Sequence, residues 1–162
     1  MSVVTHGKNP AVDASEDLTS DFRLVFRVQA LVKRLVNQKL LSVLGITFSQ
    51  GSALLHLARS PEVSCQELAQ LLGCGTSRIS RLVHDLEKRR LIESRRGGAD
   101  RRVLQLALTA DGAALAYRVP VVLRDAEQSV LAVLPGNEQR CLLKFLSRLA
   151  ANIDRSECAI EA

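Results

Sequence analysis

The chain has 162 residues, of which 47% are apolar, 24% are charged and 3% are aromatic, and its formal net charge is +5. This length suits one domain with additional oligomerisation helices, and the composition excludes a mainly disordered chain. The few aromatic residues argue against a single-strand binder that stacks bases, and no apolar run approaches the ~20 residues that cross a bilayer. The start of the chain lacks a secretory signal pattern and the four cysteines form no Cys-x-x-Cys pair, so we expect a soluble cytoplasmic protein without membrane association.

The first part of the chain predicts an arm followed by a long helix. Residues 1–16 mix Gly, Pro, Asn, Asp and Ser without periodicity, which favours a flexible arm. From about Leu18 to Leu44 the apolar residues recur at helical spacing, and Gly45 can end the helix. Such a helix exposes more apolar surface than a small domain covers, which indicates a partner chain.

Three shorter helices are predicted next. The first runs from Thr47 to Ala58. Ser64 and Glu67 then have the spacing of a capping box, in which each side chain accepts a hydrogen bond from the other residue's backbone amide. The helix that this box opens ends near Gly73, and the last of the three runs from Thr76 to Arg90.

Beyond this helix the apolar period changes from 3.6 to 2, which indicates strands. Residues 92–96 and 103–108 are the two strand candidates, and the Gly-Gly-Ala-Asp segment between them supplies the flexible backbone of a hairpin tip. Two short helices joined by a glycine turn and followed by a basic hairpin predict a winged helix-turn-helix.

The C-terminal part predicts two more helices. Thr109 can cap a long helix to about Leu134, which Pro120 should kink or split in two. A break at Pro135-Gly136-Asn137 precedes a last amphipathic helix, whose apolar stripe consists of Leu142, Leu143, Leu146, Leu149 and Ile153.

The positive charge is concentrated in one sixth of the chain. Between Thr76 and Arg102 there are nine basic and four acidic side chains, whereas the rest of the chain carries 13 of each. A cationic segment in an otherwise neutral protein is typical of a polyanion-binding surface, although a solvated helix face gives the same pattern.

The helix expected from Thr76 separates apolar and polar residues onto opposite faces. The apolar face consists of Ile79, Leu82, Val83 and Leu86. The opposite face consists of Ser77, Arg81, His84 and Lys88, with Arg78 and Ser80 on its flanks. Arginines and hydroxyls on an exposed helix face can read base edges in a DNA major groove, and the helix N-terminus favours phosphate.

The hairpin predicts a second DNA-reading element. Arg101 and Arg102 lie at its tip, where a narrow minor groove attracts arginine, and Arg95 and Arg96 on the incoming strand can contact flanking phosphates. Asp100 is interpreted as an orienting partner of Arg102 through a charge-assisted hydrogen bond.

The run from Ser64 to Gly112 resembles the MarR family of bacterial and archaeal winged-helix regulators. The resemblance is carried by the helix TSRISRLVHDLEKRRLIES, the wing GGADRRVLQLALT and the following TADG, and it extends over about residues 18–153. It implies a mainly α (α+β) fold, in which residues 17–46 and 110–155 are dimerisation helices and residues 47–109 are the winged helix-turn-helix. It also implies a homodimer that places two recognition helices one turn of duplex DNA apart.

The resemblance implies roles for individual residues. Asp100 and Arg102 match the family's wing aspartate and minor-groove arginine. The positions that touch the major groove match Thr76, Ser77, Arg78, Ser80 and Arg81. Ser64 and Gln66, at the start of the preceding helix, are expected as further phosphate contacts.

A ligand-responsive repressor that acts on a pseudo-palindromic operator is the function that the resemblance implies. The family places a small-molecule effector between the dimerisation helices and the winged domain. The candidate lining residues are Phe22, Arg23, Phe26, His56, Arg59 and Tyr117. Ordinary core or surface positions are the alternative interpretation of these six residues.

Other functional classes find less support. No nucleophile, base and orienting group cluster in the sequence, and the histidines His6, His56 and His84 are scattered, so we expect no enzymatic activity, no metal site and no cofactor. Two alternatives stay open. One is a winged-helix interaction module that does not read DNA, and the other is a redox-responsive regulator that uses Cys65 or Cys74, which lie at helix starts where a thiol pKa can fall.

Overall fold

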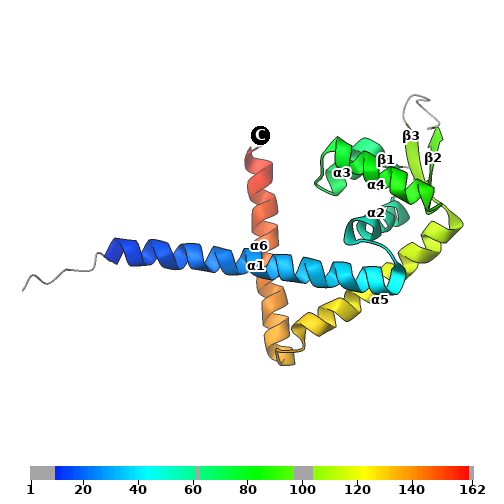
Figure 1. The fold of residues 1–162 in the computed structure, drawn as a ribbon. Helices are drawn as coiled ribbons and strands as arrows, with labels where there is room; N and C mark the ends of the chain where they lie inside the picture. Colours follow the sequence, from blue (N-terminus) through cyan, green and yellow to red (C-terminus); the bar gives the residue numbers. More distant parts are fainter. Residues whose placement is uncertain (1–9, 61–62, 97–103, 161–162) are drawn as a thin grey trace, which may run out of the picture. The chain divides into compact units, whose positions relative to one another are not determined.

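The structure, a computed structural model, describes residues 10–60, 63–96 and 104–160, without the side chains of residues 10–21, 96, 104, 154 and 156–160 (Figure 1). The chain divides into two compact units, Met1–Leu123 and Arg124–Ala162, which we describe separately. The elements in chain order are α1 (Pro10–Leu44), α2 (Phe48–Arg59), β1 (Val63–Ser64), α3 (Cys65–Leu71), α4 (Thr76–Lys88), β2 (Ile92–Arg96), β3 (Leu104–Leu108), α5 (Ala110–Leu131) and α6 (Gly136–Ile160). The predicted class is confirmed: a mainly helical chain that contains a winged helix-turn-helix.

Helix α1 is longer than the sequence predicts. It begins at Pro10, although residues 1–16 were expected to form a flexible arm; residues 1–9 lie outside the described part of the chain. Proline fits the first helical position because its φ is already helical and the amide hydrogen that it lacks has no partner there. The helix ends at Leu44, where Gly45 adopts a positive φ of 65°.

Capping boxes fix the starts of α2 and α3. At α2, the Gln50 amide donates to Thr47 Oγ1 at 3.2 Å and the Thr47 amide donates to Gln50 Oε1 at 2.9 Å. At α3, the Ser64 amide and hydroxyl donate to Glu67 Oε2 at 2.8 and 2.7 Å, and these bonds lower the pKa of the Glu67 carboxyl. The sequence predicted the second box correctly.

The wing is a three-stranded antiparallel sheet in the order β1-β3-β2. Ile92 of β2 faces Leu108 of β3, and Val63 of β1 faces Leu106, which is fully buried at the centre of the sheet. The sequence did not predict β1, because a two-residue strand is too short to show a period.

One apolar core joins the helices of the first unit to this sheet. Its largest fully buried side chains come from α1, the α1–α2 turn, α2, α3, α4, β3 and α5: Leu40, Ile46, Leu54, Leu57, Leu68, Ile79, Leu86, Leu106 and Val119. Burial of each such side chain stabilises the fold by roughly 1.5–3 kcal/mol. The core that supports the winged helix-turn-helix therefore extends beyond residues 47–109 and includes the end of α1 and the start of α5.

The C-terminal helices differ from the prediction at one point. Helix α5 continues through Pro120, so the predicted split of this helix is wrong. Pro120 itself is exposed, while Val119 before it and Val122 after it are buried and hold both sides of the proline on the core. In the second unit, the Gln139 side chain donates to the carbonyls of Leu131 and Leu134 and thereby closes the turn before α6.

The apolar stripe of α6 lies largely in the open. Leu143, Leu146, Leu149 and Ile153 are each more than 40% exposed. Among the described residues no single helix has the length and apolar content to cross a bilayer; part of α1 (22–44) meets that test only together with α2, at a 75° bend.

Candidate nucleic-acid interface

Helix α4 has one buried face and one exposed face, as its sequence predicts. Ile79, Val83 and Leu86 are buried in the core, and Leu82 is half-buried. The predicted DNA-facing residues are all exposed: Thr76, Ser77, Arg78, Ser80, Arg81, His84 and Lys88. Because the buried face fixes the rotation of the helix about its axis, these polar side chains share the solvent side.

The start of α4 leaves backbone amides available. Its N-cap is Gly75, which makes no side-chain capping bond, and the amides of Arg78 and Ile79 donate to the Gly75 carbonyl. A helix start without a side-chain cap presents N–H groups and the positive end of the helix dipole. This end of α4 can therefore accept an anion such as a phosphate.

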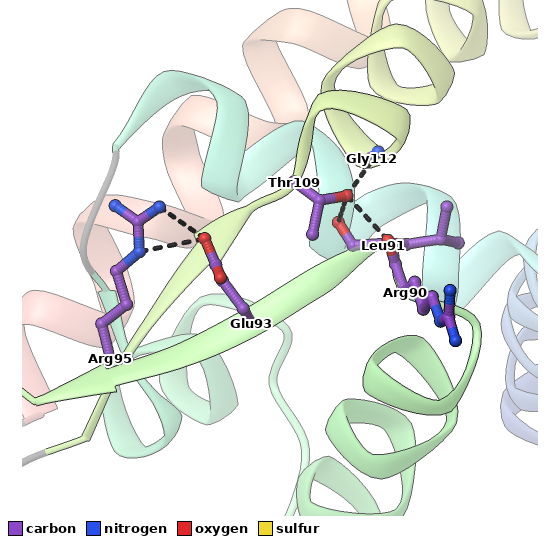
Figure 2. A network of polar contacts seen from close by, with 6 residues as sticks. All are labelled: Arg90, Leu91, Glu93, Arg95, Thr109 and Gly112. Atoms are coloured by element: carbon purple, nitrogen blue, oxygen red, sulfur yellow. Dashed lines mark hydrogen bonds and ion pairs between the residues drawn. The ribbon is translucent and has the colours of Figure 1, made fainter.

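The structure describes the side chain of one predicted phosphate contact in the wing, Arg95. Arg95 of β2 is exposed and pairs with Glu93, two residues away on the same face of the strand (Figure 2). An exposed pair of this kind contributes at most about 1 kcal/mol, so a phosphate can replace the carboxylate. The Arg96 side chain and all atoms of Asp100, Arg101 and Arg102 lie outside the described residues.

A cluster of short polar contacts locks the end of α4 and the start of β2 onto α5 (Figure 2). The Thr109 hydroxyl lies 2.7 Å from the Arg90 carbonyl oxygen and 3.2 Å from that of Leu91, to either of which it can donate. The Thr109 hydroxyl oxygen also accepts a hydrogen bond from the Gly112 amide at 3.0 Å, and this bond caps α5. A Cβ atom at Gly112 would lie 1.8 Å from the Leu91 carbonyl oxygen.

These contacts explain the L-T-x-x-G pattern of residues 108–112. Threonine supplies one oxygen that both caps a helix and binds the preceding segment, and glycine allows that segment to pass directly over the helix. Thr109 and Gly112 therefore fix the position of the segment that joins α4 to β2 against the start of α5.

Comparison with known proteins agrees with this geometry. The MarR family profile matches residues 44–103. The transcriptional repressor Rv2887 of Mycobacterium tuberculosis is 32% identical over 129 residues, which are 80% of this chain and 92% of the relative. The chain belongs to the MarR family.

Solved structures support the same assignment. The crystal structure of Rv2887 with p-aminosalicylic acid has a TM-score of 0.66 and 31% identity, covering 79% of this chain and 96% of that one. Apo MarR of Escherichia coli has a TM-score of 0.72 and 25% identity, covering 78% and 94%. Rv2887 has also been solved with salicylic acid.

The end of the recognition helix of this MarR-family protein has a feature that the sequence did not reveal. Arg90 adopts a positive φ of 57°, like Gly45 and Gly73 at two other helix ends. The Leu91 amide donates to the Leu86 carbonyl at 3.0 Å, which is the bond that closes a Schellman cap. A non-glycine residue in this conformation costs about 1–2 kcal/mol, and an arginine in the sequence gives no sign of it.

The two expected phosphate contacts on α3 have different surroundings. Ser64, the N-cap of α3, is half-buried, and its hydroxyl already donates to Glu67. The Gln66 side chain is exposed. Of the two, Gln66 is therefore the residue whose side chain the fold presents to a ligand.

The thiol of Cys65 does not have the environment of a reactive cysteine. A helix start can lower the pKa of a thiol, but at Cys65 burial, followed by the nearby Glu87 carboxylate, raises the pKa. Cys74 is half-buried and Cys141 is exposed. The shift at Cys65 works against redox sensing through this residue, because the thiolate is the reactive form.

Five of the six candidate effector residues of this MarR-family protein are exposed in the single chain. Phe22 and Phe26 are 65% and 64% exposed, Tyr117 is 84% exposed, Arg23 and Arg59 are exposed, and His56 is half-buried. Two cavities of about 560 and 460 Å³ are lined by other side chains, the first by residues of α6 and the second by Ser60, Val63 of β1 and residues of α3. Among the described residues, no group of His, Cys, Asp and Glu could hold a metal ion.

Proposed function

We propose that this MarR-family protein is a homodimeric transcriptional repressor that binds a pseudo-palindromic duplex site and responds to a small-molecule effector. The observation that carries the proposal is the face of α4, where every predicted DNA-facing side chain is exposed and the opposite side is buried. The mycobacterial relatives named as transcriptional repressors support the same function. A repressor of this kind acts on the chromosome, so we place it in the cytoplasm.

The recognition helix reads the major groove. Arg81, at the centre of the exposed face, can donate two hydrogen bonds to one guanine, and Ser77 can reach a base or a phosphate. The helix start at Gly75 binds a backbone phosphate, which fixes the register of the helix on the duplex.

The wing contributes a second set of contacts. Arg95 and Arg96 bind phosphates beside the groove, and Arg101 and Arg102 reach the minor groove, with Asp100 orienting Arg102. Only the Arg95 side chain of this set is described, and it is exposed and paired with a replaceable carboxylate.

Dimerisation is supported by apolar surface that the described chain leaves open. On α1, Phe22, Leu24, Val25 and Phe26 are each at least 60% exposed, and the stripe of α6 is also exposed. Apolar surface of this extent is typical of an interface between subunits. In a dimer the two recognition helices lie about one helical turn of DNA apart.

The effector is proposed from the relatives together with the charge of this chain. Rv2887 binds p-aminosalicylic acid and salicylic acid, which are small aromatic carboxylates. Arg23 or Arg59 can pair with such a carboxylate, and Phe22, Phe26, His56 and Tyr117 can pack against its ring once a partner subunit covers them.

Replacing Arg81 with alanine tests the proposal at its centre. We expect the variant to lose about 1–3 kcal/mol of binding to the preferred duplex and to relax base preference at one position in each half-site. The measurement is a titration of single-base variants of a duplex that the wild-type protein selects from a random pool. Arg140→Ala on α6 removes the same charge from an exposed position and should bind normally. An equal loss on every sequence would mean that Arg81 contacts only phosphate.

A further inference from the structure

The corner between α1 and α2 is held by side chains rather than by backbone alone. Asn37 of α1 accepts a hydrogen bond from the Phe48 amide at 2.9 Å, which satisfies one of the free amides at the start of α2. Gln50 accepts the Thr47 amide at 2.9 Å and is 8% exposed. These hydrogen bonds fix the direction of α2 relative to the end of α1.

The recognition helix reaches this corner through one side chain. Arg89 follows Lys88 as the C-cap of α4, and its Nη1 donates to Gln50 Oε1 at 3.3 Å. Its Nη2 lies 3.9 Å from where a Cβ of Gly45 would be, so the guanidinium lies across the end of α1. A hydrogen bond between residues 39 apart in sequence thus connects the C-cap of the recognition helix to the first turn of α2, at the corner that α2 forms with α1.

We propose that Arg89 and Gln50 form a link that sets the orientation of the recognition helix relative to α1, and thereby the separation of the two recognition helices in the dimer. Arg89 is then a positioning residue and not a reader of bases or phosphates. The inference rests on the proposed DNA-binding dimer. Because α4 is 13 residues long, about 20 Å, a small tilt at its C-terminal end displaces its DNA-reading start by a larger distance.

The test compares Arg89→Met and Gln50→Met on duplexes that differ in half-site separation. The wild-type protein selects its preferred duplex from a random pool, and derivatives with one base pair added or removed between the half-sites are then titrated. We expect each variant to lose roughly fivefold in affinity for the correct spacing, the size of effect that loss of one ordinary hydrogen bond produces. The loss should be smaller on the altered spacings, so that discrimination between spacings falls.

Further variants separate positioning from direct contact. Gln50→Met removes the bond to Arg89 and also the bond from the Thr47 amide, so the double variant should bind no worse than Gln50→Met alone. Gln50→Glu keeps an acceptor for Arg89 and should retain wild-type discrimination, and Arg140→Met controls for loss of charge. The salt dependence of binding should stay unchanged in all of them.

Two results would overturn the link. One is a uniform loss in Arg89→Met across spacings with a salt slope lower by about one, which would identify a phosphate contact. The other is unchanged spacing discrimination in Arg89→Met; this result decides the matter even if Gln50→Met fails to fold, because Arg89 is exposed and its variant should fold. A wild-type protein that selects no duplex would instead overturn the proposed function, before any variant is compared.

Discussion

Replacing Gly112 with alanine is expected to lower the free energy of unfolding by more than about 4 kcal/mol. The added Cβ would lie 1.8 Å from the carbonyl oxygen and 2.8 Å from the carbonyl carbon of Leu91, and both are backbone atoms that cannot rotate away. To relieve the clash, the start of α5 must move from the segment that follows α4, which breaks the Thr109 contacts. Urea unfolding followed by circular dichroism measures the change.

Gly51→Ala is the matched control for this substitution. Gly51 is also a buried helical glycine of the first unit, but a Cβ there would lie 3.5 Å from Val119 and 3.6 Å from Ile46 and Leu40, which are ordinary contacts. Alanine is favoured over glycine in a helix by up to about 1 kcal/mol, so stability should be unchanged or higher. If Gly112→Ala were as stable as Gly51→Ala, the close approach of Leu91 to α5 would be wrong.

Leu86→Ala is expected to destabilise the protein by about 2–5 kcal/mol. Leu86 is fully buried on the core-facing side of the recognition helix α4, so its truncation leaves a cavity between this helix and the core. Thermal or urea unfolding measures the loss, and DNA binding should fall with the folded fraction.

The contrast with Arg81→Ala on the same helix makes this prediction specific. Arg81 is exposed, so the free energy of unfolding of its variant should lie within about 0.5 kcal/mol of the wild-type value, although the variant binds DNA more weakly. Loss of stability in Arg81→Ala, or a stable Leu86→Ala, would show that the two faces of α4 are assigned the wrong way round.

Several features of the fold were predictable because they depend on neighbours in sequence. The box of Ser64 and Glu67, the cap at Thr109 and the buried side of α4 each follow from side chains within three or four residues of one another. The exposed side chains of α4 could be predicted for the same reason. Helical periodicity is enough to place them on one face.

The features that were not predicted depend on contacts between distant segments or on backbone conformation. The strand at Val63 exists only because β3 pairs with it, and Arg90 takes a conformation usual for glycine. The link from Arg89 to Gln50 spans 39 residues. The effector candidates remain predictions, because Phe22 and the other apolar members are exposed in the single chain and a binding site there needs covering surface.

The most direct test of a DNA-reading protein is the salt dependence of wild-type binding to a duplex from its own upstream region, with a scrambled duplex of equal length for comparison. If the exposed cations of α4 and the wing face phosphates, affinity should fall by about 10³ to 10⁵ between roughly 50 and 200 mM salt, as expected for 6–10 phosphate contacts. At any one salt concentration, the upstream duplex should bind much more tightly than the scrambled one. Affinity that does not change with salt, or that is absent at low salt, would contradict the account and favour an interaction module that does not bind DNA.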